Sequence, residues 1–242
     1  MNRLRYSPLL AMTIEAKDNK LGGVEDVYYD DRTFVIRYFA VDTRRWLPGR
    51  KVLISPKSVT LIHHPDHILV TLTSDEVRAC PPLDEHKPIS RQYELLLSQH
   101  YGWPEYWLID FVTPGLRTLA IPQSETEFPP PEVRWSLEEE RKQKFAGEDY
   151  TLRSCSAIMK YNVIARDVQI GVVDDLTFNS ATWELTDFVV DSDNWGMGAP
   201  NIFIPRDNIA AISWYGKTLE LNLTKSQVKR WFVRSPFAST GS

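Results

Sequence analysis

Apolar and polar residues alternate along several short stretches of the chain. Between residues 218 and 223 every second residue is leucine, and the residues between the leucines are polar. This period of two is typical of a strand with one buried face. Short apolar runs bounded by Pro or Gly also predict strands: Lys51–Ile54, Val59–Ile62, Asn201–Ile204 and Ile209–Ile212. The chain is therefore expected to be mainly β.

One pattern occurs twice. Leu21–Val27 reads Leu-Gly-Gly-Val-Glu-Asp-Val, and Ile170–Leu176, 149 residues further on, reads Ile-Gly-Val-Val-Asp-Asp-Leu. The same spacing pairs other positions: Ala16–Asp18 with Ala165–Asp167, Thr33–Phe34 with Thr182–Trp183, Val41–Thr43 with Val190–Ser192, Trp46 with Trp195, and Pro56–Lys57 with Pro205–Arg206. The spacing then drifts by about two residues, which one small loop insertion would explain. These matches predict an internal duplication.

The apolar pattern changes phase once within each copy. In the strand expected from Thr33 to Asp42 the shared apolar positions are 34, 36, 39 and 41, and the second copy repeats the change. A β-bulge or sharp bend is the natural interpretation. Each copy closes near a threonine, Thr73 or Thr224, that could cap a single helical turn.

The segment between the copies resembles neither of them. Ser90 and Gly102 flank a stretch that predicts an amphipathic helix over about residues 90–101, with one side formed by Tyr93, Leu96, Leu97 and His100. Three consecutive prolines within residues 125–131 and a charge run at 138–142 predict an extended connector after it.

Composition limits the classes of function. The net charge of −4 gives no compositional support for direct binding to nucleic acid. No apolar run reaches the roughly 20 residues that a transmembrane helix needs. The two cysteines, Cys80 and Cys155, stand in no metal-binding or catalytic motif. A cytoplasmic protein without a transmembrane segment is the expectation.

The repeated motifs resemble the PRC-barrel domain family, which is named for the H subunit of the photosynthetic reaction centre. The Leu-Gly-Gly-Val-Glu-Asp start, the strand running to Val41-Asp42-Thr43, and the closing Leu72–Val77 carry the resemblance. It covers about residues 2–107, including the segment from Pro88 to Pro104 that resembles stand-alone bacterial members, and 151–230. It implies six-stranded barrels that bind other macromolecules and carry out no chemistry of their own.

The predicted fold class is mainly β, with two small β-barrels related by internal duplication and joined by a helix and a Pro-rich connector. We expect a first domain over residues 1–82, a connector over 83–150, a second domain over 151–234 and a C-terminal tail over 235–242. A duplicated chain can bury between its copies what a twofold dimer buries between subunits, so we expect pseudo-twofold packing of the barrels or a homodimer.

The cluster His63, His64 and His67 is the most metal-like feature, because imidazoles are good ligands for zinc or nickel. The equivalent stretch of the second copy, residues 213–218, contains no such ligands. We therefore interpret the cluster as a hairpin tip, and neither a metal nor a cofactor is expected.

Carboxylates also stand side by side in both copies, as Glu25-Asp26 and Asp174-Asp175. They could form an acid/base pair. Because both copies retain them, a shared turn or strand start is the preferred interpretation, and the same reasoning applies to Asp42, Asp191, Trp46 and Trp195.

Residues without a duplicate are the better candidates for a specific role. The aromatic series Tyr93, Trp103, Tyr106 and Trp107 predicts a partner-binding surface, since Trp and Tyr dominate binding hot spots. Covering one end of a barrel is the alternative role for these rings.

The function expected is therefore that of a non-enzymatic protein-binding, assembly or adaptor module. Its partner would be another protein, with a membrane-associated or ribonucleoprotein complex as possible settings. A ribosome- or RNA-maturation-associated factor is one alternative. A metal-dependent enzyme or metal sensor that uses the histidine cluster is the other.

Overall fold

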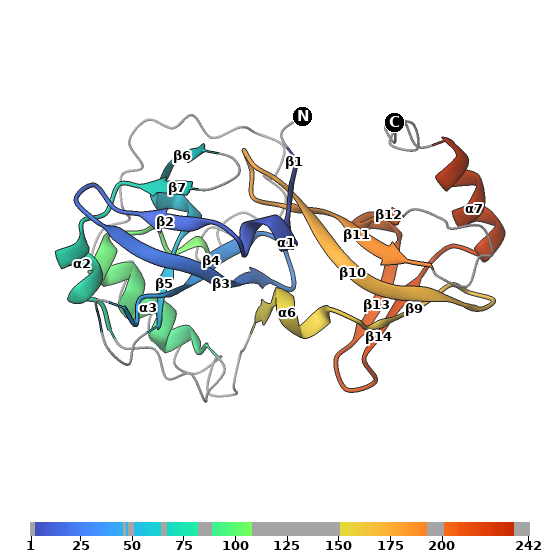
Figure 1. The fold of residues 1–242 in the computed structure, drawn as a ribbon. Coiled ribbons are helices and arrows are strands. Elements are labelled where there is room, and N and C mark those ends of the chain that lie inside the picture. The colour runs from blue at the N-terminus through green and yellow to red at the C-terminus, as the bar shows by residue number, and fades with distance from the viewer. Residues whose placement is uncertain are drawn as a thin grey trace, which may run out of the picture. The chain divides into compact units, whose positions relative to one another are not determined.

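The computed structural model describes residues 3–45, 47, 51–63, 67–81, 89–107, 151–192 and 201–234. The chain divides into two compact units. Residues 1–78 and 151–242 form one unit, so both repeats belong to it, and residues 79–150 form the other. Figure 1 shows the elements of both units.

The first repeat folds into an antiparallel sheet with one parallel pair. Its elements are β1 (Arg3–Arg5), α1 (Tyr6–Leu9), β2 (Thr13–Glu15), β3 (Lys20–Asp30), β4 (Ile36–Asp42), β5 (Lys51–Ile54), η1 (Pro56–Ser58), β6 (Val59–His63), β7 (His67–Val70) and α2 (Ser74–Arg78). The strand order is β5-β4-β3-β2-β7-β6, and the parallel pair is β2 with β7. The two ends of this order, β5 and β6, are joined in sequence by the short turn η1.

The second repeat has the same arrangement. Its elements are β8 (Leu152–Ser154), α6 (Cys155–Ile158), β9 (Asn162–Ile164), β10 (Gln169–Asn179), β11 (Leu185–Asp191), β12 (Ile202–Pro205), η3 (Arg206–Asn208), β13 (Ile209–Ser213), β14 (Thr218–Leu221) and α7 (Lys225–Arg234). Its order, β12-β11-β10-β9-β14-β13, reproduces that of the first repeat strand by strand. The mainly β fold with two related small sheets is confirmed.

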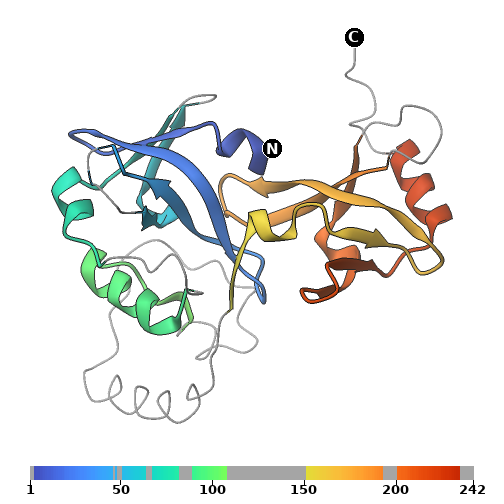
Figure 2. The ribbon, with the colours of Figure 1, turned by 60° about the horizontal axis from the view of Figure 1, so that its bottom comes forward.

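The two repeats exchange their first strands. β1 pairs with β10 of the second repeat, with Arg3 opposite Asn179 and Arg5 opposite Thr177. In return β8 pairs with β3 of the first repeat, with Tyr28 opposite Ser154. Each sheet has seven strands for this reason, one of them from the other repeat. Figures 1 and 2 both show the yellow β8–α6 segment beside the blue strands of the first repeat.

Phe34 and Trp183 occupy equivalent positions where the repeats meet. Both have a left-handed backbone, with φ of 57° and 60°. The Ile36 amide donates to the Trp183 carbonyl (2.8 Å) and the Leu185 amide donates to the Phe34 carbonyl (2.7 Å).

The rings of these two residues cross between the repeats as well. Phe34 packs edge-on against Phe188 with ring centres 6.5 Å apart, and Trp183 packs edge-on against Phe39 at 5.2 Å. These contacts are reciprocal between the repeats, as pseudo-twofold packing predicts.

A glycine shared by both copies is required by sterics. A Cβ atom on Gly22 would lie 1.8 Å from the Asp42 carbonyl oxygen, and one on Gly171 would lie 2.0 Å from the Asp191 carbonyl oxygen. A Cβ atom on Gly23, in contrast, would meet nothing within 4 Å. This explains why the motif retains its first glycine in both copies while the second is replaced by Val172.

The expected change of phase in the strand pattern is confirmed as a bulge. The pairing of β3 with β4 skips Arg37, and that of β10 with β11 skips Thr186, its equivalent. The strand itself begins at Ile36 and not at Thr33, because Phe34 turns the chain before the strand starts.

The structural alignment also corrects the sequence alignment. Phe39 faces Ile54 and Phe188 faces Ile204, so the spacing is already 150 at β5 and β12, and the match of Pro56 with Pro205 is wrong by one residue. The drift therefore comes from two single-residue insertions and not from one. The second lies in the hairpin turn, which has three residues between β6 and β7 and four between β13 and β14.

Both threonine caps occur. The Glu76 amide donates to Thr73 Oγ1 while the Thr73 amide donates to Glu76 Oε2 (2.7 Å), which is a capping box. Thr224 and Gln227 form the same reciprocal pair. The second helix, α7, extends to Arg234 and is much longer than the expected single turn.

The connector helix α3 (Arg91–Tyr101) forms as predicted. Ser90 Oγ accepts from the Tyr93 amide at its start, and Gly102 closes it with a left-handed φ of 67°. The predicted buried side is wrong in part: Leu96 is 50% exposed, whereas Glu94 and Ser98 are buried beside Leu97. The proline-rich and charged stretches predicted at 125–131 and 138–142 lie outside the described residues.

Candidate functional site

Asp26 connects the second repeat to the first through hydrogen bonds. Its carboxylate accepts hydrogen bonds from Tyr6 Oη (2.9 Å), from Ser156 Oγ (2.9 Å) and from the Ser154 hydroxyl. The Ser156 backbone amide also donates to it (3.2 Å), as does the Val27 amide (2.7 Å). Burial, followed by the neighbouring carboxylate, raises the pKa of Tyr6 well above its ordinary value. The phenol therefore stays protonated and donates.

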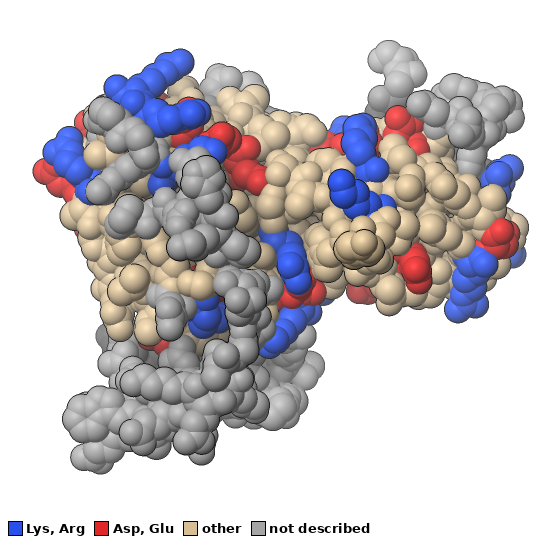
Figure 3. Space-filling view, turned by 90° about the horizontal axis from the view of Figure 1, so that it is seen from below, with Lys and Arg blue, Asp and Glu red and all other residues tan. Residues whose placement is uncertain are grey.

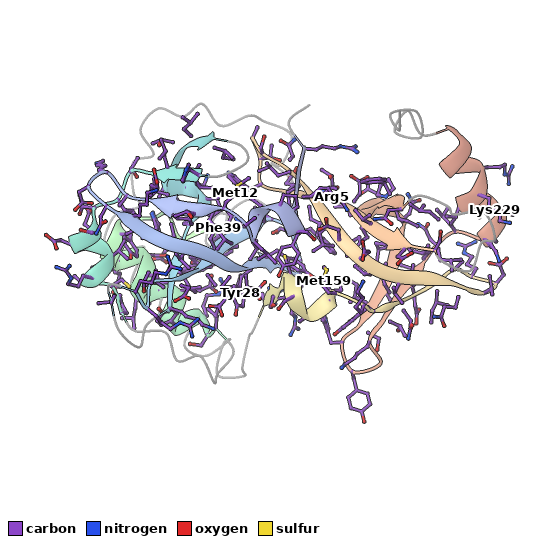
Figure 4. The ribbon with its side chains drawn as sticks, viewed as in Figure 1. Arg5, Met12, Tyr28, Phe39, Met159 and Lys229 are labelled. Atoms are coloured by element: carbon purple, nitrogen blue, oxygen red, sulfur yellow. The ribbon has the colours of Figure 1, made fainter. Side chains whose placement is uncertain are left out.

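Asp175, in the second repeat, makes the equivalent contacts with the first repeat. It is 1% exposed and accepts from the Ser7 amide (3.0 Å) and the Leu176 amide (2.8 Å). Arg5, labelled in Figure 4 near the junction of β1 and α1, forms an ion pair with it at 2.8 Å. Asp26 and Asp175 thus occupy equivalent sites, one held mainly by hydroxyl groups and the other by a guanidinium.

The paired acids are therefore structural, but they mark neither a turn nor a strand start. Asp26 and Asp175 lie inside the long strands β3 and β10, each next to a bulge that falls at Glu25 and Asp174. The bulged acids point to other partners: Glu25 pairs with Lys51 (2.9 Å) and Asp174 with Lys160 (2.8 Å). Within each pair one carboxylate joins the repeats and the other binds a lysine on its own repeat.

Cys155 takes the place in the second repeat that Tyr6 takes in the first. It is fully buried, and burial raises the pKa of its thiol well above the usual range. A thiol that stays protonated and inaccessible is a poor nucleophile. Its role is packing.

The histidine cluster flanks a hairpin, as the sequence comparison predicted. β6 ends at His63 and β7 begins at His67, and the two residues are paired across the strands. His67 Nδ1 lies 3.2 Å from Glu15 Oε1, while His64 lies outside the described residues. Among the residues that the structure describes, no group of three or more His, Cys, Asp or Glu side chains could hold a metal ion.

Two of the candidate partner-binding aromatics contribute to a polar cluster in the connector. Tyr106 Oη donates to Glu94 Oε2 (2.5 Å), and Arg91 lies 2.9 Å from Glu94 Oε1. The Arg91 guanidinium also stacks over the rings of Tyr106 (5.4 Å) and Trp107 (4.6 Å). Trp107 is only 7% exposed. These contacts hold α3 to the Trp103–Trp107 segment.

Tyr93 and Trp103 also make contacts within the connector. Tyr93 Oη donates to the Pro81 carbonyl (2.9 Å), and Trp103 stacks on Tyr101 with ring centres 4.2 Å apart. Both side chains remain half-buried. Partner binding by Tyr93, Trp103, Tyr106 and Trp107 stays a prediction, and their observed contacts stabilise the connector.

Comparison with known families finds a match for the first repeat. Residues 1–77 match the PRC-barrel domain family. The first repeat is a PRC-barrel domain. The second repeat lies outside the matched residues but has the same strand order, the same bulge and the same sterically required glycine. No curated protein matches the chain.

Sequence reasoning missed one aromatic cluster, which the second repeat has and the PRC-barrel domain of the first repeat lacks. Trp214, in the turn between β13 and β14, meets the ring of Tyr161 at 6.0 Å and the guanidinium of Arg153 at 4.8 Å. Tyr161 Oη donates to the Trp214 carbonyl (3.3 Å). The signal was present in the sequence, because Trp214 replaces His64 of the first repeat and Tyr215 replaces Pro65.

Among the described residues, no helix is both long and apolar enough to cross a membrane.

Proposed function

We propose that this chain is a cytoplasmic, non-enzymatic protein-binding module that takes part in assembling a larger complex. The PRC-barrel match over residues 1–77 supports the proposal, because a PRC-barrel domain suggests a role in protein interaction or assembly. Fold alone does not fix function, so the proposal also depends on how this chain uses its polar residues.

The reciprocal exchange of first strands is the observation that carries the proposal. The carboxylates of Asp26 and Asp175, the most acid/base-like groups in the sequence, are occupied by hydrogen bonds and an ion pair between the repeats. This arrangement fixes two related sheets as one platform. A rigid platform loses little conformational entropy on binding, which favours recognition of a partner.

The connector supplies a second, aromatic region. Arg91, Glu94 and Tyr106 form a cluster that gives residues 89–107 a defined local structure. In the proposal this segment contacts the partner through Tyr93 and Trp103, two of the half-buried members of the aromatic series.

Affinity purification tests the proposal. The tagged full chain is cross-linked in cells of its native source, treated with ribonuclease and purified, and its partners are identified by mass spectrometry. We expect one protein in near-stoichiometric amount that resists ribonuclease. A Trp103→Ala variant should recover less of it if the connector contributes to the contact. Failure to recover any specific protein would contradict the proposal, and turnover of a substrate by the purified chain would replace it with an enzymatic role.

The same preparation separates the two alternatives. Recovery of ribosomal particles would favour a ribosome-linked role. Zinc or nickel found by elemental analysis at neutral pH, and lost in a His67→Ala variant, would favour a metal-dependent one.

A further inference from the structure

The turn between β13 and β14 projects an aromatic side chain into solvent. Tyr215 is 102% exposed, and Lys217 in the same turn is also exposed. Trp214 beside them is half-buried and held by Tyr161 and Arg153. Trp, Tyr and Arg are the residue types most enriched at binding hot spots. The turn therefore combines the protruding ring of Tyr215 with the ring of Trp214, which its neighbours already hold in place.

The equivalent positions of the first repeat show whether the shared fold requires this cluster. Arg153, Lys160 and Tyr161 replace Leu4, Ala11 and Met12 of the first repeat. The turn is also one residue longer than its counterpart between β6 and β7. The shared fold therefore does not require the cluster, since the first repeat forms the same sheet without it.

The backbone around the cluster contains two strained residues. Lys160 and Lys217 both adopt a left-handed conformation, with φ of 64° and 50°. For a residue other than glycine this costs roughly 1–2 kcal/mol. The two segments are joined, because the Asn162 amide donates to the Lys217 carbonyl (3.0 Å). Strain of this kind concentrates at functional sites.

Three cations lie around the cluster, and two of them are paired with carboxylates. Arg153 binds the Asp31 carboxylate (2.8 Å) and Lys160 binds the Asp174 carboxylate (2.8 Å), while Lys217 adds a third cation. Figure 3 views the side on which this hairpin projects in Figure 1, and most of the surface of the second repeat there is uncharged, with both basic and acidic side chains among it. A partner carboxylate would complement the exposed Lys217, the cation that these two ion pairs leave in surplus.

We propose that Trp214, Tyr215 and Lys217, with Arg153 and Lys160 behind them, form a docking surface for a protein that offers an apolar pocket rimmed by Asp or Glu. Tyr215 enters the pocket, because a fully exposed ring on a hairpin tip can be buried only by a concave partner. Lys217 pairs with the acidic rim. This inference rests on the proposed protein-binding function and assigns it to one surface.

Site-specific cross-linking in the full chain tests the surface. The photoreactive amino acid benzoylphenylalanine replaces Tyr215 in one variant and Leu61, an exposed apolar residue of the first repeat that is 51% exposed, in the control. We expect a cross-link from position 215 and none from position 61, with the captured peptide bordered by Asp or Glu. The affinity of the purified pair should fall at least tenfold for Tyr215→Ala and for Lys217→Glu. A Leu61→Ala variant should bind as the unaltered chain does.

The outcomes separate the two proposals. If the unaltered chain recovers a partner whose affinity Tyr215→Ala and Lys217→Glu leave unchanged, the docking surface is wrong and the binding function stands. A cross-link from position 215 only to nucleic acid or to a second copy of this chain also overturns the surface. If the unaltered chain binds no protein, both proposals fail. Circular dichroism and thermal unfolding verify that the variants are folded, which is expected because Tyr215 and Lys217 are exposed.

Discussion

The two repeats share their strand order but differ in the side chains that hold them together. Asp26 is surrounded by hydroxyl groups of Tyr6, Ser154 and Ser156, whereas Asp175 is paired with Arg5. The backbone donors Ser156 N and Ser7 N are equivalent and are retained on both sides. The backbone contact is therefore what the fold requires, and the side-chain partners are free to diverge as long as the carboxylate remains satisfied.

A second contrast concerns the hairpin that follows each η turn. In the first repeat it carries His63 and His67 at the strand ends, and in the second repeat it carries Trp214 and Tyr215. A position that differs while the surrounding sheet is unchanged is not constrained by the fold. The differences between the repeats therefore indicate specific function better than the similarities do.

The largest expected effect comes from the glycine that both repeats retain. Gly22→Ala places a Cβ atom against the Asp42 carbonyl, so β3 and β4 must separate, and we expect a loss of about 4 kcal/mol or more in the free energy of unfolding. Gly23→Val copies the residue of the second repeat and should cost less than about 0.5 kcal/mol. Chemical denaturation of both variants measures the difference, and equal losses would refute the steric explanation.

The second-largest effect is expected from the adjacent acids of β10, Asp174 and Asp175, whose replacement should destabilise the chain to different extents. Asp175→Ala removes the acceptor of the Ser7 and Leu176 amides and the partner of Arg5, so we expect a loss of about 3 kcal/mol. Asp174→Ala removes a surface pair with Lys160 and should cost less than about 1 kcal/mol. Urea unfolding of the two variants compares them. A larger loss for Asp174→Ala would show that the strand exchange does not depend on Asp175.

Much of this fold follows from local sequence signals. The mainly β fold with two similar sheets, the bulges at Arg37 and Thr186, and helix α3 with its Ser90 cap and Gly102 end were predicted correctly, because periodicity and capping act over a few residues. Phe34 was assigned to a strand because its apolar side chain fitted the pattern, whereas its left-handed turn is stabilised by contacts with the other repeat.

The exchange of strands could not be predicted from local patterns. Asp26 meets Ser154 and Ser156 across more than a hundred residues, and no periodicity marks such a contact. The buried side of α3 was misjudged because a polar residue, Glu94, is buried there and is neutralised by Arg91. The cluster around Trp214 could have been found by asking where the second copy gains aromatic residues.

A smaller effect is expected where the first repeat has a hydroxyl that the second lacks. Tyr29 is equivalent to Phe178, and both are fully buried. Among the described residues the Tyr29 hydroxyl has no hydrogen-bond partner, and burial raises the pKa of this phenol well above its usual value. Tyr29→Phe should therefore stabilise the chain by about 1 kcal/mol, measured by thermal unfolding. A destabilised variant would show that the hydroxyl is bonded, for example to buried water.

The smallest expected effect concerns Asp42, the last residue of β4. The Arg44 side chain and backbone donate to Asp42 and lower the pKa of its carboxyl to about 2, whereas the second repeat has Asp193 at the position of Arg44. Because the folded pKa is depressed, the stabilisation is present above pH 4 and is lost as the pH falls towards 2. Arg44→Gln should raise the pKa of Asp42 towards 3.8, as a carboxyl NMR titration would show. Because the pair is solvent-exposed, the loss of stability at neutral pH should stay below about 1 kcal/mol and vanish below pH 2. An unchanged pKa in the variant would mean that the backbone amide at position 44 alone sets it.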